Sequence, residues 1–284
     1  TFQVNKSPFC GIDGKFVTSR QISARLDQEL KRNVALRVEA TDDSEKFVVS
    51  GRGELHLGVL IETMRREGYE LAVSRPAVIY KTVDGQRMEP WERLTVDFDG
   101  DYQGSVMSKI AERKGKLETM TPDGKGRVRL EYSIPARGLI GFRTEYLTAT
   151  AGTGLIYHAF EQYEPFIESD IGRRSNGVLV SMAAGKALAY SLFTLQERGS
   201  LFIGHSTDVY EGMIIGIHSR QSDLAVNPTK AKQLNNIRAA GTDENLLLTP
   251  PIILSLEQAL EFIDDDELVE ITPKSIRLRK MHLK

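Results

Sequence analysis

The residues with the clearest chemical potential lie in one stretch near the C-terminal end, residues 227–251, which reads NPTKAKQLNNIRAAGTDENLLLTPP. Its cations meet no acid before Asp243, and side-chain amides lie between them. Cations neutralise phosphates, and amides can donate to and accept from riboses and base edges. These residue types favour contact with RNA, and the candidate residues are Lys230, Lys232, Gln233, Asn235, Asn236 and Arg238.

The borders of this stretch indicate a long loop. A short apolar run, residues 213–218, precedes it, and Pro250 and Pro251 end it, because proline lacks the backbone donor that a helix interior or central strand requires. Connections of more than about twenty residues are uncommon in compact domains and are usually functional or disordered. The alternative is a solvated helix over residues 228–240, with Leu234 and Ile237 facing the body of the protein. The residues alone leave both interpretations open.

A second group of cations lies in the sequence AERKGK at residues 111–116. Arg113 and Lys114 lie in the last turn of a predicted helix and Lys116 follows it, so all three could reach phosphates from an exposed tip between two elements. Cations in the last turn of a helix also stabilise the helix dipole by a few tenths of a kcal/mol, which is the purely structural alternative.

The elements before the loop repeat one order twice. A strand, a helix, a hairpin, a helix and a strand are predicted from the apolar spacing at residues 2–9, 20–33, 34–50, 53–67 and from 69 onward. The same order recurs, ending before residue 165, at residues 93–98, 103–114, 116–134, 139–147 and 154–160. This is the βαββαβ order of ferredoxin-like domains.

The remaining residues have a different rhythm. Short strands are predicted at residues 178–182, 201–204, 213–218, 268–271 and 275–279, with helices at 186–198 and 256–263. The predicted fold class is therefore α+β: two tandem ferredoxin-like domains, then a β-rich mixed C-terminal domain with a long basic loop. The predicted domain bounds are 1–85, 86–165 and 166–284.

Composition limits the function classes. The chain has 284 residues, of which 27% are charged, and its net charge of −2 excludes a globally basic nucleic-acid binder. One cysteine, Cys10, cannot form an internal disulfide and favours a reducing compartment. No apolar run is long enough to span a bilayer. We expect a cytoplasmic monomer that binds neither membrane nor DNA, and the opening at Thr1 favours a fragment of a longer protein.

Several kinds of site are absent from the sequence. No stretch matches the phosphate-binding loop GxxxxGK followed by Ser or Thr, and the histidines and the cysteine lack metal-ligand spacing. The strands lack the aromatic pattern with which RNA-recognition motifs stack bases. We therefore expect no catalytic residue, no cofactor and no metal site in this chain. Small-ligand regulatory domains can share the paired ferredoxin-like topology, and such a module is the alternative function.

Longer stretches carry a resemblance to known families. The run SGRGELHLGVLIETMRREGYE at residues 50–70 resembles the third domain of translational GTPases of the elongation factor G type. GSVMSKIAERKGKLETM and IPARGLIGFRTEYLTATAGTG resemble the fifth domain of those factors. GVLVSMAAGKALAYSLFTLQERGSLFIGHSTDVYEGMIIG and the long loop resemble the C-terminal domain of the BipA (TypA) family.

The resemblance implies a function in translation. Members of this family carry a GTPase domain that binds GTP and Mg²⁺, in a part that this chain lacks, so the fragment itself would not be an enzyme. They bind the ribosome at the translation-factor site and act in stress and cold adaptation and in large-subunit assembly. By this likeness, partners would be large-subunit ribosomal RNA, ribosomal proteins and the acceptor arm of A-site transfer RNA, approached by the long loop and by the tip at Arg113, Lys114 and Lys116.

Overall fold

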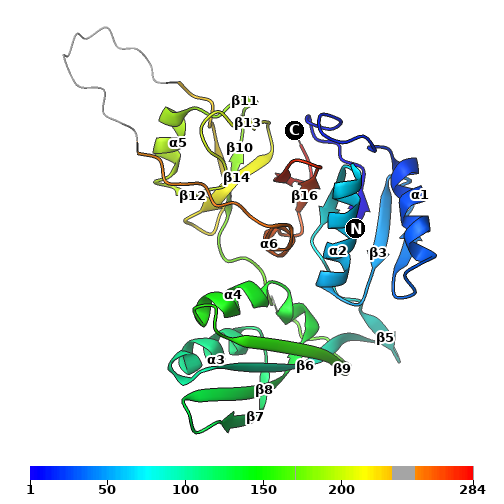
Figure 1. Cartoon of the computed structure of the whole chain (residues 1–284), viewed down its shortest axis with the longest axis vertical. Helices are drawn as coiled ribbons and strands as arrows, with labels where there is room; N and C mark the ends of the chain where they lie inside the picture. The colour runs from blue at the N-terminus through cyan, green and yellow to red at the C-terminus, as the bar shows by residue number, and fades with distance from the viewer. Residues whose placement is uncertain (170, 232–246, 284) are drawn as a thin grey trace, which may run out of the picture. The chain divides into compact units, whose positions relative to one another are not determined.

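The computed structural model describes residues 1–169, 171–231 and 247–283. By its contacts the chain forms two compact units (Figure 1). Unit 1 joins Thr1–Arg75 to Arg174–Lys284, and unit 2 is Pro76–Arg173. None of the helices within the described ranges has the length and apolar character needed to cross a bilayer.

The first part of unit 1 is the predicted ferredoxin-like module. Its strands lie in the order β4-β1-β3-β2 and are antiparallel throughout. The elements are β1 (Phe2–Gln3), α1 (Ser19–Leu30), β2 (Arg37–Ala40), β3 (Lys46–Ser50), α2 (Glu54–Glu67) and β4 (Leu71–Ser74). This strand order confirms the predicted topology for the module.

Local chemistry explains where its helices begin and end. Thr18 and Gln21 form a reciprocal capping box at the start of α1, which satisfies backbone donors that a helix start leaves open. Ile22 and Leu26 on α1 are fully buried. Helix α2 ends at Gly68, whose φ of 99° is the left-handed conformation that glycine adopts at low cost.

The C-terminal segment continues the same sheet. Leu268 to Ile271 on β16 pair antiparallel with Ser74 to Leu71 on β4, and the ten-stranded sheet runs β15-β10-β14-β17-β16-β4-β1-β3-β2, with β12 beside β14 (Figure 1). The elements of this segment are β10 (Val178–Ser181), β11 (Gly185–Lys186), α5 (Ala189–Leu195), β12 (Gly199–Leu201), β13 (Asp208–Val209), β14 (Met213–His218), β15 (Leu224–Val226), α6 (Leu256–Phe262), β16 (Glu267–Ile271) and β17 (Ile276–Lys280). The first and third predicted domains thus share one sheet and one compact unit, and the three-domain division stays a prediction about sequence modules.

The N-terminal strand is shorter than predicted because its continuation serves a buried polar network. Asn5 and Ser7 donate side-chain hydrogen bonds of 3.1 and 2.7 Å to Glu270 of β16, whose side chain is fully buried. Tyr210 donates to the same carboxylate at 2.6 Å. Burial and this carboxylate strongly raise the pKa of Tyr210, so it remains a neutral donor. Residues after Gln3 therefore bind β16 through side chains instead of extending β1.

Unit 2 is the second predicted ferredoxin-like module, with strand order β9-β6-β8-β7 and β5 beside one end of β6. Leu94, Val96 and Phe98 alternate along β6 and are fully buried with the helices. The elements are β5 (Lys81–Val83), β6 (Gln86–Asp99), the 3₁₀ turn η1 (Gly100–Tyr102), α3 (Gln103–Glu112), β7 (Lys116–Pro122), β8 (Arg127–Pro135), the 3₁₀ turn η2 (Ala136–Leu139), α4 (Phe142–Ala149) and β9 (Leu155–Pro165). The fold class is confirmed as α+β.

Candidate nucleic-acid interface

Helix α5 fixes the start of the long basic stretch. Ser191 donates from its hydroxyl to the carbonyl of Asn227, and the backbone N–H of Leu188 donates to Pro228 at 2.9 Å. Asn227 in turn accepts from the backbone and hydroxyl of Thr229 at 2.9 and 2.8 Å. These bonds hold residues 227–229 against one helix and explain why no strand continues past Val226.

The same helix region fixes the far end of the stretch. Gln196, directly after α5, donates from Nε2 to the carbonyl of Leu247 at 3.1 Å and accepts from the backbone N–H of Thr249 at 3.0 Å. We call residues 227–231 and 247–249 the stem. Both segments of the stem are therefore held beside α5, the first near the start of the helix and the second directly after its end (Figure 1).

The structure describes one of the six residues predicted in this stretch. Lys230 is exposed, and no ion pair joins it to any residue within the described ranges. The other five predicted residues lie outside the described residues: Lys232, Gln233, Asn235, Asn236 and Arg238. The choice between loop and solvated helix for residues 232–240 lies outside them too.

Arg113, predicted at an exposed tip, is a buried structural cation. It is 8% exposed, and one guanidinium nitrogen donates to the carbonyls of Gly138 and Ile140 at 2.6 and 3.0 Å. Another lies 3.3 Å from the Glu145 carboxylate, and the guanidinium stands over the Phe142 ring. The expectation of an exposed guanidinium is wrong, because the turn between β8 and α4 supplies carbonyls that need a donor.

The other two cations of this tip do reach solvent. Lys114 is exposed and has a φ of 62° in the tight turn that ends α3. Lys116 is also exposed, but its ammonium lies 3.1 Å from the Glu164 carboxylate and 4.1 Å from the centre of the Trp91 ring. An RNA phosphate would meet Lys114 directly and would compete with Glu164 for Lys116.

One end of the first module gathers cations that the sequence analysis did not single out. Arg37 at the start of β2 pairs with Ser50 at the end of β3. The backbone N–H of Arg52 donates to His56 at 3.2 Å, and Asn33 after α1 lies 2.7 Å from the other ring nitrogen of His56. The exposed cations at this end are Lys31, Arg32, Arg37 and Arg52. The sequence could have indicated this cluster, because the cations lie at the end of one element and the start of the next. The βαββαβ topology brings those ends together.

Other cations of unit 1 are bound inside the fold. Arg174 forms two hydrogen bonds of 2.8 and 2.9 Å to Glu267, whose side chain is fully buried, and Lys280 binds the same carboxylate at 2.9 Å. Burial acts to raise the pKa of Glu267, but the hydrogen bonds and charge of Arg174 outweigh it and hold the pKa below its ordinary value. These cations stabilise the ionised carboxylate and are not free to bind RNA.

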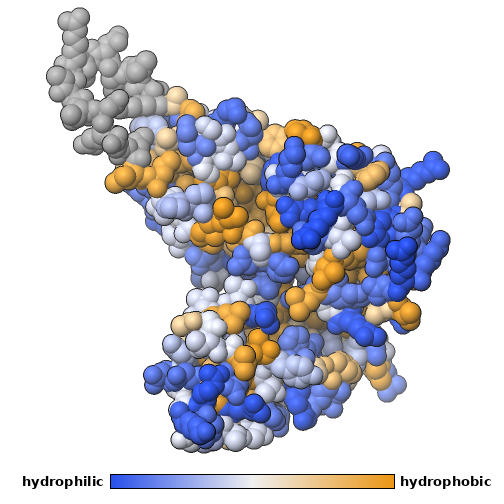
Figure 2. All heavy atoms as spheres, viewed as in Figure 1, coloured by the Kyte–Doolittle hydropathy of each residue, from blue (hydrophilic) through white to orange (hydrophobic). Residues whose placement is uncertain are grey.

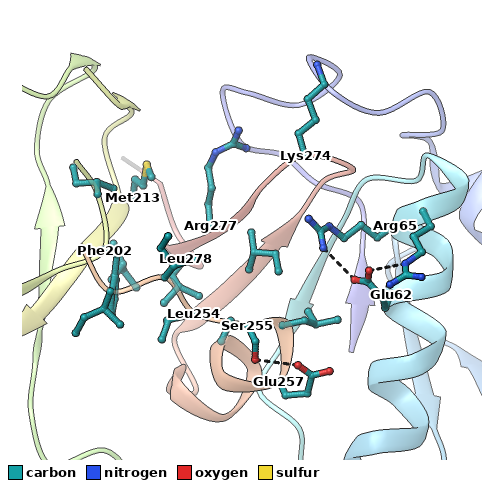
Figure 3. A pocket seen from close by; sticks show the side chains of 18 residues that line it. Glu62, Arg65, Phe202, Met213, Leu254, Ser255, Glu257, Lys274, Arg277 and Leu278 are labelled. Carbon is teal, nitrogen blue, oxygen red and sulfur yellow. Dashed lines mark hydrogen bonds and ion pairs between the residues drawn. The ribbon is translucent and has the colours of Figure 1, made fainter. Parts of the chain in front are cut away.

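A groove of about 560 Å³ lies in unit 1 between α2, α6, β17 and residues 252–255 (Figure 3). Its floor is apolar, and each cation on its rim already has an acidic partner. Arg65 and Arg66 bind Glu62 at 3.1 and 2.9 Å, Arg277 binds Glu270 at 3.0 Å, and Lys274 lies 3.8 Å from Asp13. A small charged metabolite would find no unpaired cation there, so the groove does not favour the small-ligand alternative.

No group of three or more metal-binding side chains comes together in the part of the chain that the structure describes. Within the described residues, the candidate interface consists of the exposed cations at one end of the first module and of the stem, which α5 holds. Lys114 is a separate exposed cation in unit 2.

Comparison with known proteins identifies the family. The family model of the TypA/BipA C-terminal domain matches residues 176–284, and that of the elongation factor G C-terminus matches residues 86–173. The large ribosomal subunit assembly factor BipA of Salmonella typhimurium is 64% identical over 282 residues, which cover 99% of this chain. The chain belongs to the TypA/BipA family. Proteins of the same name from Escherichia coli K12 and Buchnera aphidicola are 63% and 56% identical over 99% and 100% of the chain.

The TypA/BipA match has a defined extent. The chain spans 46% of the length of the Salmonella and E. coli relatives and 47% of the Buchnera relative. Both matching family models describe C-terminal domains, so the TypA/BipA chain corresponds to the C-terminal part of those proteins. The resemblance predicted from the residues is confirmed.

Proposed function

We propose that this chain is the ribosome-binding, non-catalytic part of a translational GTPase that acts in assembly of the large ribosomal subunit. The observation that carries the proposal is the stem. Helix α5 and Gln196 bind both segments of the stem. Lys230 is exposed at the start of a stretch that contains no acid before Asp243. The name of its relatives, large ribosomal subunit assembly factor, agrees with this chemistry.

In this proposal the basic stretch contacts ribosomal RNA and the acceptor arm of A-site transfer RNA. Cations position phosphates, and amides hydrogen-bond riboses or base edges. Phosphate contacts would come from Lys230, Lys232 and Arg238, and ribose or base contacts from Gln233, Asn235 and Asn236. The basic end of the first module, with Lys114 and Lys116 in unit 2, would add further phosphate contacts.

GTP and Mg²⁺ would bind to another part of the whole protein. The described chain offers neither a phosphate-binding loop in its sequence nor a metal cluster among its described residues. We propose that it orients the GTPase on the ribosome. Cytoplasmic location and a monomeric state are further parts of the proposal.

Cosedimentation of the purified chain with large ribosomal subunits over a salt series tests the proposal. If three cations of the stretch each neutralise one phosphate, their share of the affinity falls by about 20- to 40-fold between 50 and 200 mM salt, from slopes of about 0.7 to 0.9 per contact. A triple alanine variant at Lys230, Lys232 and Arg238 should remove that share.

The matched control is a triple alanine variant at three exposed cations elsewhere, Lys15, Lys125 and Arg220. It has the same change in net charge and should keep the wild-type salt dependence. Equal salt slopes for the wild type and the variant at Lys230, Lys232 and Arg238 would remove the basic stretch from the interface.

A further inference from the structure

Two aromatic rings lie on the exposed side of α5. Tyr190 and Phe193 are one helical turn apart and are 40% and 36% exposed. Figure 2 shows apolar side chains gathered over this part of the C-terminal segment. Large rings such as Trp91, Tyr146 and Phe142 are buried, so exposed rings beside a basic surface indicate a candidate binding surface.

The opposite side of α5 holds the helix firmly in place. Ser191, Leu192 and Leu195 are buried, the two leucines in the core formed by β10, β14 and neighbouring residues. The bonds from Leu188, Ser191 and Gln196 to the stem fix the helix at both ends. A ring on such a helix needs little further ordering when a flat ligand stacks on it.

Two cations come from the described segments next to α5. Residues 186–196 and 224–231 contain Lys186 and Lys230 and no acid, and the exposed Glu197 that follows is adjacent to the exposed Arg198. A Cβ atom on Gly185 would lie 3.4 Å from Thr229, so Lys186 and Lys230 follow two residues that are in contact. Among the described residues, Lys186 forms an ion pair with Asp208 at 3.4 Å, and both side chains are more than 60% exposed. Exposed pairs of this kind contribute little and exchange readily for a phosphate.

We propose that the outer face of α5 is a stacking platform for unpaired RNA bases, with Tyr190 and Phe193 under the bases and Lys186 and Lys230 at the flanking phosphates. This proposal rests on the proposed function and adds that α5 binds RNA with unpaired bases. Base-paired RNA hides its ring faces within the helix, whereas unpaired bases can stack on aromatic side chains. The same site therefore selects single-stranded or looped RNA over a duplex.

Fluorescence anisotropy on the full chain tests this with two labelled probes, a single-stranded oligouridine of about twelve nucleotides and an RNA duplex of similar charge. The double variant Tyr190→Ala/Phe193→Ala should weaken binding of the single strand by about 5- to 100-fold and change duplex binding much less, since stacking contributes most per unpaired base. The double variant Tyr190→Phe/Phe193→Tyr keeps both rings and should retain wild-type affinity.

Exposed aromatic residues elsewhere supply the control. Tyr157 and Phe160 on β9 of unit 2 are 68% and 60% exposed, so Tyr157→Ala/Phe160→Ala removes at least as much exposed ring surface. This variant should bind the single strand as the wild type does. If it weakens binding as much as the α5 variant, the rings act nonspecifically and the platform is wrong.

Other outcomes separate the platform from the proposed function. Ribosome cosedimentation that responds to the basic stretch, with single-strand binding unchanged in Tyr190→Ala/Phe193→Ala, overturns the platform and leaves the proposed function standing. Ring-dependent binding of the single strand without ribosome cosedimentation supports the platform and overturns the proposed function. Absence of single-strand binding by the wild-type chain, or preference for the duplex, overturns the platform.

Discussion

Arg113 in unit 2 and Lys230 in unit 1 come from the two cation-rich stretches that the sequence marks as RNA-binding candidates. The Arg113 guanidinium is buried against two backbone carbonyls, a carboxylate and an aromatic ring. Lys230 is exposed in the stem. A cationic side chain thus has a structural role where the turn after a strand offers carbonyl acceptors, and remains on the surface in the stem, where Leu188 and Ser191 already bind the neighbouring backbone carbonyls. The number of cations in a stretch does not distinguish these roles, whereas the acceptors around them do.

The largest expected effect breaks the structural member of this pair. Arg113→Ala leaves the carbonyls of Gly138 and Ile140 without their donor and should lower the free energy of unfolding by about 2–4 kcal/mol. Chemical denaturation measures this. Lys114→Ala, at the exposed neighbour, should stay within about 0.5 kcal/mol of the wild type. A small effect of Arg113→Ala would mean that its guanidinium is available for RNA after all.

A second change tests the bound cations of unit 1. Glu267→Gln weakens the charge-assisted bonds to Arg174 and Lys280 and should cost about 1.5–3 kcal/mol near neutral pH. Because the pKa of Glu267 is below its ordinary value in the fold, its contribution is complete above the unfolded pKa and is lost as pH falls through the folded pKa.

Denaturation of both proteins at several pH values checks this. The difference between wild type and Glu267→Gln should therefore shrink as the pH falls below about 4.5. A difference that stays constant from neutral pH to strongly acidic conditions would show that the charge of Glu267 contributes nothing.

The smallest effect concerns Lys116. It is exposed like Lys230 but has protein partners like Arg113. The Lys116 side chain is 59% exposed, which weakens its contacts with Glu164 and the Trp91 ring, so Lys116→Ala should change stability by less than about 1 kcal/mol. Cosedimentation of the Lys116→Ala variant with large subunits should keep more of the wild-type salt dependence than cosedimentation of the Lys230→Ala variant. Lys116 would have to give up Glu164 to bind a phosphate, whereas Lys230 has no acidic partner among the described residues. Equal losses would place both lysines on phosphates.

Several features of the fold follow from local sequence. The strand at residues 213–218 matches Met213–His218, and the strand KFVVS matches Lys46–Ser50. The helix predicted over residues 53–67 ends where α2 ends, before Gly68, because glycine takes the left-handed conformation at low cost. Apolar spacing and turn residues are short-range properties. They predict each helix, strand and turn separately, and the repeated βαββαβ order follows from the succession of these elements.

Other features depended on partners distant in sequence. The helix predicted over residues 186–198 is Ala189–Leu195, because Lys186 pairs with Asp208 in the small β11–β13 sheet and Gly199 to Leu201 pair with β14. At Gly199 a Cβ atom would lie 1.8 Å from the carbonyl of Ile217, so the close approach of β14 requires glycine there. Apolar spacing within residues 186–198 contains no information about pairing with Asp208 or with β14.

For the candidate site, the sequence determined which residues carry charge, where amides gather and which family motifs are present. The tertiary structure decided which cations are exposed. It put the Arg113 guanidinium inside unit 2 and gathered four cations at one end of the first module. It also joined β16 to β4 in one sheet and placed both segments of the stem beside α5. The physical reason is that charge and hydrogen-bonding capacity belong to each side chain, whereas burial and the supply of acceptors depend on neighbours that only folding brings together.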